Sequence, residues 1–524
     1  MSKWARARRI RQGVQIVFFA LFIYLMFATV QQRVAPALAD LFFRLNPLSA
    51  LGAMLAGRTW LPRLALALIT IGLALLFGRV WCGWICPLGS LLEWVSFRKR
   101  RKKEPSFHPR LRTIKYFLFA TILVLALLGN STLLALDPIA ILTRSTTTVV
   151  IPSLNYAITT IETTLYPLYF LQPVLDWLES WLRGPILPIK QPAFAQSILI
   201  GLVFAAILGL NALADRFWCR YLCPLGGLLG LLAKVSIFRP VIGTACNHCT
   251  RCALVCRPGA VEVSPETVSI APSECIVCLD CLASCKKEDI RFQPVFRPAA
   301  SREYDLTRRE ALGVMGVGLA SLLLFRTDLR NRRQNPLLIR PPGVNDEDKF
   351  LSSCLRCTQC VKICPTTALQ PAFDQAGLEG FWTPVLVPRV GYCDYGCTAC
   401  GQVCPSGAIP RLTLEEKRQE VIGKANVNKN RCLPWASATP CIVCEEMCPT
   451  PQKSIRLEEA TVLNGEDQPV TVQRPHVLRE LCIGCGICEN HCPLEGEAAI
   501  LVASQPRTRP TSPGGGRGSS RGSG

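Results

Sequence analysis

The sequence predicts an α-helical membrane unit followed by two small, cysteine-rich α+β modules. Three observations lead to this prediction. Half of the 524 residues are hydrophobic, four apolar runs in the first half are each long enough to cross a membrane, and 28 cysteines recur at regular spacings. The formal net charge of +21 does not indicate a nucleic-acid surface, because much of the basic excess flanks the apolar runs, as on the cytoplasmic side of membrane proteins.

The four apolar runs cover about residues 14–30, 60–80, 116–136 and 194–214. Basic residues precede the first run and follow the second and fourth, which places the N-terminus inside and predicts four crossings that end inside. A cleaved signal peptide is the alternative for the first run, but no small-residue cleavage site closes it. The stretch 137–190 is then expected outside, as an amphipathic loop near the membrane interface or a re-entrant helix.

An internal repeat divides this unit into two halves that run in the same direction. Each half has an Asn-Pro or Asp-Pro turn and ends in C-x-x-x-C-P, so we expect a parallel four-helix repeat with both cysteine pairs on the cytoplasmic side. Two cysteines at i and i+4 share one helix face. Together the four thiols would hold a metal or a cluster or undergo redox chemistry; the alternative is that they are small buried side chains. These candidate redox thiols are Cys82, Cys86, Cys219 and Cys223.

The first cysteine-rich module contains C-x2-C-x2-C-x3-C twice. In this pattern three closely spaced thiolates bind one [4Fe–4S] cluster, and the fourth cysteine binds the other. Arg257 and Lys286 stand where a proline usually follows the fourth cysteine, and we expect their charge to raise the reduction potentials. The predicted ligands are Cys246, Cys249, Cys252 and Cys285 for one cluster, and Cys275, Cys278, Cys281 and Cys256 for the other.

The second module contains four such motifs, each ending in Cys-Pro. Two keep the regular spacing, one widens its first gap by one residue, and one has a long first gap. Motif by motif, the cysteines are Cys354, Cys357, Cys360 and Cys364; Cys393, Cys397, Cys400 and Cys404; Cys432, Cys441, Cys444 and Cys448; and Cys482, Cys485, Cys488 and Cys492. They predict four more clusters, about six in all. The spacing leaves two pairings open, adjacent motifs or nested motifs (first with fourth, second with third).

Other cofactors fit this sequence less well. A zinc site joins two separated C-x2-C pairs, and disulfide scaffolds are small and secreted, whereas here a four-cysteine motif recurs six times. The chain has no C-x-x-C-H motif, no histidine inside the four apolar runs, and no Walker or Rossmann fingerprint. We therefore expect neither c-type nor bis-histidine haem, and no nicotinamide or ATP chemistry.

Composition divides the chain into five parts: residues 1–240, 241–298, 299–349, 350–504 and 505–524. These are the membrane unit, the first module, a linker, the second module and a Gly/Ser/Arg/Pro tail that is expected to be disordered. The linker contains Thr-Arg-Arg-Glu-Ala-Leu before a short apolar run, which resembles an internal twin-arginine export signal and offers a candidate fifth anchor helix. An ordinary amphipathic helix is the alternative. We expect the second module outside.

Residues from about 10 to 292 resemble the NapH-type membrane ferredoxins, and residues 301–502 resemble the NapG or MauM type, so the chain looks like a fusion of the two. The resemblance implies bacterial ferredoxin-like modules in the inner membrane of a prokaryote. It also implies electron transfer from the quinol pool, or a cytoplasmic donor, to an extracytoplasmic c-type cytochrome or a reductase such as periplasmic nitrate reductase. Quinol oxidation is the one enzymatic activity expected, and no nucleic-acid partner is expected. The alternatives are a membrane copper reductase that uses the C-x-x-x-C-P thiols, and a redox-sensing or assembly factor.

Overall fold

The computed structural model describes residues 3–30, 36–96, 109–183, 187–188, 191–264, 267–285, 287–296, 308–326, 335–463 and 468–504. The predicted basic run 98–103, the cation Lys286 and the C-terminal tail 505–524 lie outside the described residues.

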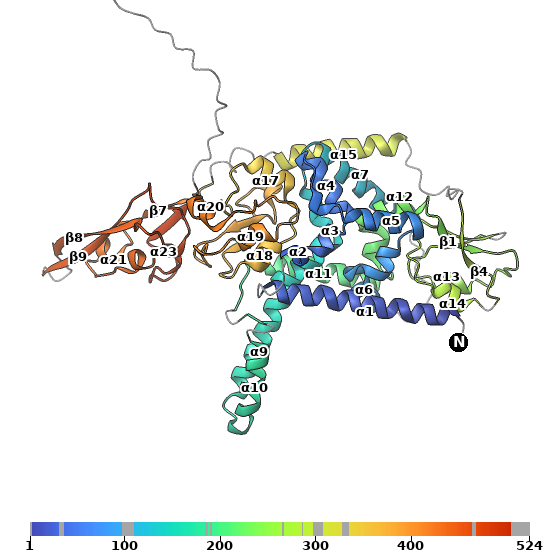
Figure 1. The fold of residues 1–524 in the computed structure, drawn as a ribbon, viewed down its shortest axis with the longest axis horizontal. Coiled ribbons are helices and arrows are strands. Elements are labelled where there is room, and N and C mark those ends of the chain that lie inside the picture. Colours follow the sequence, from blue (N-terminus) through green and yellow to red (C-terminus); the bar gives the residue numbers. More distant parts are fainter. Residues whose placement is uncertain are drawn as a thin grey trace, which may run out of the picture.

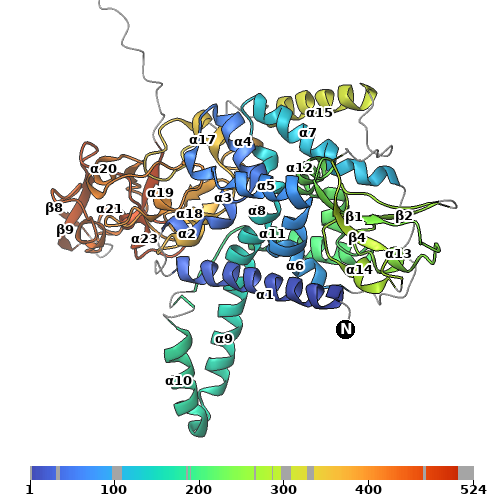
Figure 2. The ribbon, with the colours of Figure 1, turned by 45° about the vertical axis from the view of Figure 1, so that its right-hand side comes forward.

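A unit of mostly short helices forms the middle of the molecule, with a cysteine-rich module at each end (Figure 1, and turned by 45° in Figure 2). Helix α1 (Lys3–Val30) runs along one side of this unit. The other elements of the unit are α2 (Pro36–Ala39), α3 (Leu41–Arg44), α4 (Pro47–Gly57), η1 (Pro62–Leu64), α5 (Ala67–Phe77), η2 (Trp81–Ile85), α6 (Pro87–Trp94), η3 (Pro109–Thr113), α7 (Ile114–Leu127), η4 (Thr132–Leu136), α8 (Pro138–Ser145), η5 (Thr146–Val150), α9 (Ile151–Leu165), η6 (Tyr169–Leu171), α10 (Gln172–Leu182), α11 (Ser197–Gly209), η7 (Leu210–Ala212), η8 (Trp218–Leu222) and α12 (Pro224–Ala233).

Among the described helices, α1 alone is long and apolar enough to cross a membrane. The expectation of single helices about 20 residues long is wrong for the other three apolar runs. The run 60–80 contains Pro62 and ends its regular helix before Gly78, whose φ is +73°. Helix α7 likewise stops before Gly129, at a φ of +80°. Proline and left-handed glycine interrupt helices that mean hydropathy alone would extend.

The internal repeat is visible in the way corresponding helices begin. The side chain of Asn46 caps α4 by accepting a hydrogen bond from the Leu48 amide, and Asp137 caps α8 in the same way at Ile139. In both helices a proline occupies the first turn, as is usual there. The two caps also meet, because Asn46 Nδ2 donates to Asp137 Oδ2 at 2.6 Å. The halves therefore face each other at this end of the unit.

The segment after α8, expected as an amphipathic loop or a re-entrant helix, folds into two helices. Helices α9 and α10 form a hairpin that projects away from the helical unit, crosswise to α1, in both ribbon views (Figures 1 and 2). A hydrogen bond of 2.6 Å from Arg183 Nη2 to Glu162 Oε2 joins its two arms. This hairpin leaves the unit near the C-terminal end of α1.

The first module is a small α+β fold beyond one end of the unit. Its outer strands pair antiparallel, with Phe238 opposite Pro294. Its elements are β1 (Phe238–Ile242), α13 (Arg251–Val255), β2 (Val261–Val263), β3 (Val268–Ile270), α14 (Asp280–Ser284) and β4 (Ile290–Pro294).

Helix α15 (Arg308–Arg326) begins after the first module and packs along α7 (Figure 1). A Cβ at Gly318 would come within 2.8 Å of the Val124 side chain, so the two helices are in close contact. The twin-arginine residues Arg308 and Arg309 stand at the start of this helix. The chain then continues into the second module, at the opposite end of the helical unit.

The second module also combines short helices with two-stranded sheets. Strand β7 pairs antiparallel with β10, and the longest hairpin joins β8 to β9. Its elements are α17 (Glu347–Ser353), α18 (Gln359–Ile363), β5 (Leu369–Pro371), η9 (Leu378–Gly380), β6 (Pro384–Leu386), α19 (Ala399–Gln402), α20 (Leu414–Gln419), β7 (Lys424–Val427), α21 (Leu433–Ala436), α22 (Val443–Glu446), β8 (Ile455–Leu463), β9 (Pro469–Val477), α23 (Ile487–Asn490) and β10 (Ile500–Ala503).

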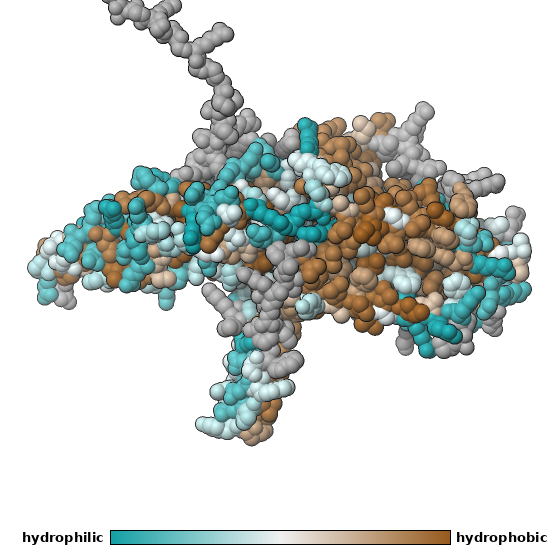
Figure 3. All heavy atoms as spheres, viewed as in Figure 1, coloured by the Kyte–Doolittle hydropathy of each residue, from teal (hydrophilic) through white to brown (hydrophobic). Residues whose placement is uncertain are grey.

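Hydrophobic residues are concentrated on the surface of the helical unit. Figure 3 shows a brown zone over the unit, whereas both ends of the molecule carry much more teal. One apolar core runs through the unit, and both modules contribute to it: Ile276 and Cys278 from the first, Leu355 and Cys357 from the second. The modules are therefore packed onto the unit and are not loosely tethered to it.

Candidate iron–sulfur centres

The second module gathers its cysteines into four groups of four. Three of the groups line separate cavities, and each combines three cysteines of one motif with the last cysteine of its neighbour. These cavities are lined by Cys432, Cys441, Cys444 and Cys492; by Cys448, Cys482, Cys485 and Cys488; and by Cys364, Cys393, Cys397 and Cys400. In the fourth group, Cys404 lies within electrostatic reach of Cys354, Cys357 and Cys360.

This geometry selects one of the two pairings that the spacing left open. Motifs pair with their sequence neighbours, first with second and third with fourth. Contacts between α18 and α19 hold the first pair together, and contacts between α22 and α23 hold the second. The β7–β10 sheet also brings the ends of the second pair side by side, with Ala425 opposite Val502. Nested pairing would require motifs that this fold keeps apart.

The first module has the same construction. Cys256, Cys275, Cys278 and Cys281 line one cavity, which is the set that the sequence motif assigns to a single cluster. In the other predicted set, Cys252 lies beside Cys246 and Cys249, and Cys252 and Cys285 both pack against the same apolar cluster. Cys249 is exposed, so this second site lies near the surface of the module.

The cysteines are arranged to suit clusters. All 28 are free thiols, so a disulfide framework does not explain them. Within the described ranges, no three His, Cys, Asp or Glu side chains close around one point as a single metal ion requires. A cubane is wider than one ion and accepts thiolates that stand further apart, so the four-cysteine cavities fit [4Fe–4S] clusters better than zinc.

Burial affects the protonation of the cluster-binding thiols. It raises the pKa of Cys256 to about 11 and that of Cys275 to about 12, and it raises the pKa of Cys444 in the second module to about 12. These thiols are therefore protonated at neutral pH until iron displaces the proton, and cluster assembly releases protons.

The four C-x-x-x-C-P thiols form one further group inside the helical unit. Cys86 lies within electrostatic reach of Cys82 and Cys219, and Cys223 within reach of all three. The residues between the two cysteines of each pair form a single π-helical turn, η2 or η8. The expectation of a continuous α-helix with i and i+4 on one face is therefore wrong. The second cysteine of each pair instead caps the next helix.

Glycine is required where each motif continues as C-P-L-G. The Gly89 amide donates to Cys86 Sγ at 3.5 Å, and the Gly226 amide donates to Cys223 Sγ at 3.3 Å. A Cβ at Gly89 would lie 2.8 Å from the carbonyl oxygen of Cys82. The glycines thus let a backbone donor approach each sulfur, a contact that tunes sulfur ligands.

Two buried arginines link the halves of the repeat. Arg216 Nη1 donates to the carbonyl oxygen of Cys82 at 3.0 Å, and Arg79 Nη2 donates to that of Cys219 at 3.3 Å. Each arginine therefore bonds to the cysteine turn of the other half. Both side chains are 1% exposed, so these are interior contacts.

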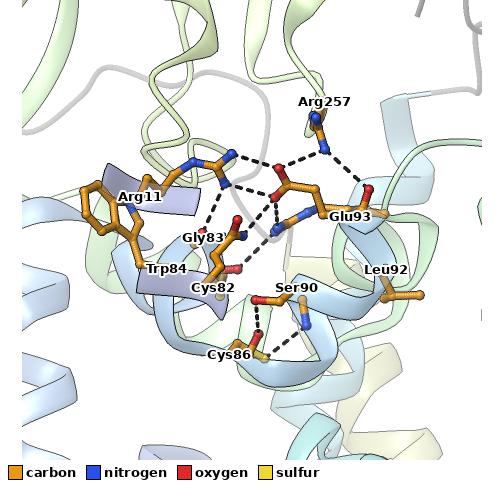
Figure 4. A network of polar contacts seen from close by, with 12 residues as sticks. Arg11, Cys82, Gly83, Trp84, Cys86, Ser90, Leu92, Glu93 and Arg257 are labelled. Carbon is orange, nitrogen blue, oxygen red and sulfur yellow. Dashed lines mark hydrogen bonds and ion pairs between the residues drawn. The ribbon is translucent and has the colours of Figure 1, made fainter. Parts of the chain in front are cut away.

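Glu93 is the centre of the polar network drawn in Figure 4. Its carboxylate accepts from Arg11 at 2.8 Å and from Arg216 at 2.6 Å, and it forms an ion pair with Arg257 at 2.8 Å. Arg257, expected to raise a reduction potential, also pairs with Asp280 at 3.4 Å. Arg257 thus also holds the first module against the helical unit, through carboxylates of both parts.

A ligand loop of the first module lies directly on the turn that carries Cys82. Trp84 Nε1 donates to the Val277 carbonyl at 3.0 Å, and a Cβ on Gly83 would be 2.0 Å from the Ile276 carbonyl oxygen. Glu274, beside the first ligand of this loop, binds the Lys115 Nζ at 2.5 Å. The cluster ligands and the four thiols are therefore joined by a short, rigid contact.

The second module docks on the opposite end of the unit through its own first ligand loop. Arg356, between two ligands, donates to Ser131 Oγ at 2.8 Å. Arg144 donates to the Arg356 carbonyl at 3.3 Å and stacks over the Trp382 ring at 3.7 Å. Ser131 Oγ in turn donates to the Cys354 carbonyl at 3.1 Å.

Sequence reasoning missed the charged residues that make these docking contacts. Glu93 and Glu274 had one detectable signal each: Glu93 is an isolated carboxylate in an apolar segment, and Glu274 directly precedes a ligand cysteine. A buried carboxylate requires cationic partners, which this chain supplies from distant segments.

Comparisons with known proteins agree with this geometry. A family model described as a 4Fe–4S binding domain matches residues 59–105 and 194–244, the two halves that carry the C-x-x-x-C-P motifs, and a second model of the same description matches 475–495. No solved structure matches the chain.

Among curated proteins, the chain is 35% identical over 204 residues to the methylamine utilization ferredoxin-type protein MauM of Methylorubrum extorquens. The aligned residues cover 37% of this chain and 88% of that protein. It is 36% identical over 198 residues to the ferredoxin-type protein NapG of Escherichia coli, covering 37% of this chain and 80% of that protein. Over 250 residues it is 30% identical to the protein NirI of Paracoccus denitrificans, covering 44% of this chain and 29% of NirI.

Proposed function

Because the chain belongs to the family of ferredoxin-type iron–sulfur proteins that includes MauM and NapG, we propose that it conducts electrons across a membrane with about six [4Fe–4S] clusters. One observation carries the proposal: two modules with cluster-ligand geometry are packed on opposite ends of a single apolar helical unit (Figures 1 and 3). The clusters, when bound, supply one-electron redox chemistry. The chain fixes their positions and shields them.

The dimensions of the helices support a membrane-spanning orientation. Helix α1 has 28 residues and is therefore about 42 Å long, against about 30 Å for the hydrocarbon core. Helix α15 has 19 residues, about 28 Å, and Leu312, Leu319 and Leu323 are exposed on its outer face. The basic residues at the start of α1 favour that end inside, with the first module, and the second module outside.

The proposed origin of this architecture is a fusion. The part of the chain similar to MauM and NapG would be the exported four-cluster module, and residues from about 10 to 292 would be a NapH-type membrane unit with its two-cluster module. In this arrangement electrons enter from the quinol pool or a cytoplasmic donor. They leave to an extracytoplasmic c-type cytochrome or a reductase. The export of a domain that has already folded around its clusters would explain the Arg-Arg pair that opens α15.

We place the four C-x-x-x-C-P thiols on the route between the modules. Ligand-loop residues of both modules, Ile276 and Leu355, pack into the same apolar core as Cys82, Cys86 and Cys223. A second candidate function, metal reduction, is favoured by the same convergence of four thiols. Copper binding by the purified protein that is lost in Cys82→Ser, without loss of quinol oxidation, would favour metal reduction instead.

The test uses sealed membranes that contain the full chain under anaerobic conditions. Duroquinol is added, and freeze-quenched electron paramagnetic resonance follows the reduced clusters; impermeant ferricyanide is then added on the side of the second module. In the wild type we expect quinol to reduce the clusters of both modules and ferricyanide to reoxidise them. In Cys82→Ser we expect the first-module clusters to be reduced but not reoxidised, and the second-module clusters to stay oxidised throughout.

Ser96→Ala is the matched control, because Ser96 is exposed and its hydroxyl donates to Asp215 Oδ1, not to any of the four thiols. If quinol reduces no cluster, the quinol-linked function is wrong. If the Cys82→Ser protein is reoxidised as fully and as fast as the wild type, the thiols are not on the route.

A further inference from the structure

The α9–α10 hairpin exposes an unusual number of large apolar side chains. On α9 the apolar residues Leu154 and Ile161 are 43% and 57% exposed, and they are spaced so that they share one face of the helix. On α10, Val174, Trp177 and Leu178 make a similar stripe, and Trp177 is 63% exposed. Neither stripe is covered by another described part of the chain.

Polar contacts fix how the two arms are rotated. Arg183 Nη2 donates to Thr159 Oγ1 at 2.9 Å and to Glu162 Oε2 at 2.6 Å, so these residues of α9 face α10. On α10 the buried residue facing the seam is Leu175. With about 100° per residue, each apolar stripe lies roughly a quarter turn from the seam, and in antiparallel helices these two directions coincide. The hairpin therefore has one apolar side, visible in Figure 3 as brown along its right-hand edge, with teal on the left.

The orientation of the hairpin matches a membrane surface. It projects crosswise to α1 and leaves the unit at the end near the second module (Figures 1 and 2). If α1 crosses the bilayer, which is part of the proposed function, the hairpin lies parallel to the bilayer plane. Its apolar side then faces the hydrocarbon, in the direction of the brown zone of the helical unit (Figure 3).

Residue types favour lipid as the occupant of this side. The tip carries Tyr166, Tyr169 and Phe170, of which Tyr169 is 84% exposed, and Tyr and Trp are the residues that concentrate at membrane interfaces. Residues 151–183 contain three acidic side chains and one basic side chain, so no electrostatic attraction to anionic headgroups or acidic protein surfaces is built in. Burial of apolar area in the interface remains as the driving force.

We propose that the α9–α10 hairpin lies in the bilayer interface on the side of the second module, with its apolar side among the lipid chains. In this position the hairpin would fix the depth and tilt of the protein relative to the bilayer. This proposal rests on the membrane placement made above, and its test separates the two.

The experiment places the photo-crosslinking residue p-benzoylphenylalanine at single positions of the full chain in native membranes and identifies adducts by mass spectrometry. Phe170 probes the tip and Trp177 the apolar side of the hairpin, and Asp176, exposed on the opposite side of α10, is the matched control. Tyr24 on α1, 62% exposed, reports membrane placement independently.

We expect phospholipid adducts at Phe170, Trp177 and Tyr24, and at least tenfold fewer at Asp176, with yields unchanged when anionic lipid is omitted. Lipid adducts at Tyr24 together with protein adducts at Phe170 and Trp177 would overturn the hairpin proposal and leave the membrane placement standing. Absence of lipid adducts at all four positions would overturn both.

Discussion

Replacing Glu93 by glutamine should loosen the contact between the first module and the helical unit. The substitution keeps the shape of the side chain but removes the charge that faces Arg11, Arg216 and Arg257, at 2.8, 2.6 and 2.8 Å. The Glu93 side chain is 3% exposed, and that of Arg11 is fully buried, so water cannot replace the lost partner. Breaking a buried ion pair by removing one member costs about 3–5 kcal/mol. At about 1.4 kcal/mol per factor of ten, local opening should become about 10²- to 10⁴-fold more frequent.

Hydrogen exchange of the native protein, read by mass spectrometry on peptides covering α6 and the Cys275–Cys278 loop, measures this opening. The control is Ser96→Ala, an exposed substitution two residues beyond the end of α6, which should change the free energy of opening of these peptides by less than about 0.5 kcal/mol. Adding Arg257→Gln to Glu93→Gln should restore part of the protection, because one uncompensated cation is removed. An acceleration below tenfold in Glu93→Gln would refute the view that this carboxylate holds the module in place.

Three further predictions concern the clusters and their docking. Anaerobically purified protein should contain about 24 iron atoms per chain, and a value near eight would mean that the second module does not carry four clusters. With adjacent pairing, Cys404→Ser combined with Cys357→Ser should lose one cluster, about four irons, whereas Cys404→Ser combined with Cys397→Ser should lose two; with nested pairing, iron and sulfide analysis would show two clusters lost in both double variants. Gly83→Ala should destabilise the docking of the first module by about 1–3 kcal/mol, because the added methyl group meets the Ile276 carbonyl oxygen. The measurement is a lower thermal midpoint, and Gly72→Ala, with open space around it, should leave the midpoint unchanged.

The spacing indicates three members of each group of cysteines, and tertiary packing decides which cysteine completes it. The motif Cys354-x2-Cys357-x2-Cys360 identifies three ligands by itself, because the three thiolates lie on one tight loop. The fourth ligand comes from another motif, and adjacent and nested pairings have the same sequence. Which one forms depends on the contact between α18 and α19, which bring Cys404 to that loop.

For the apolar runs, the sequence predicted the regions correctly but the helix lengths wrongly. Mean hydropathy identified the regions of the helical unit but extended their helices through Pro62 and Gly129, where backbone geometry ends them. The π-helical turn at Trp81–Ile85 had no periodicity to reveal it, since one turn is too short to show a period. The partners of Glu93 come from segments more than 75 residues away in the chain on either side, so no local pattern could have found them.

The exchange of arginine bonds between the two halves has a consequence for how the unit works. Membrane proteins built from two repeats often rock one repeat against the other to carry a solute. Here Arg79 and Arg216 each bond to the backbone of the other half at buried sites, and rocking would break both hydrogen bonds. The two halves are consequently held in a fixed relative position. This suits the proposed transfer of electrons, which requires no conformational change. Turnover should then depend on the separation and potentials of its redox sites and not on a conformational cycle.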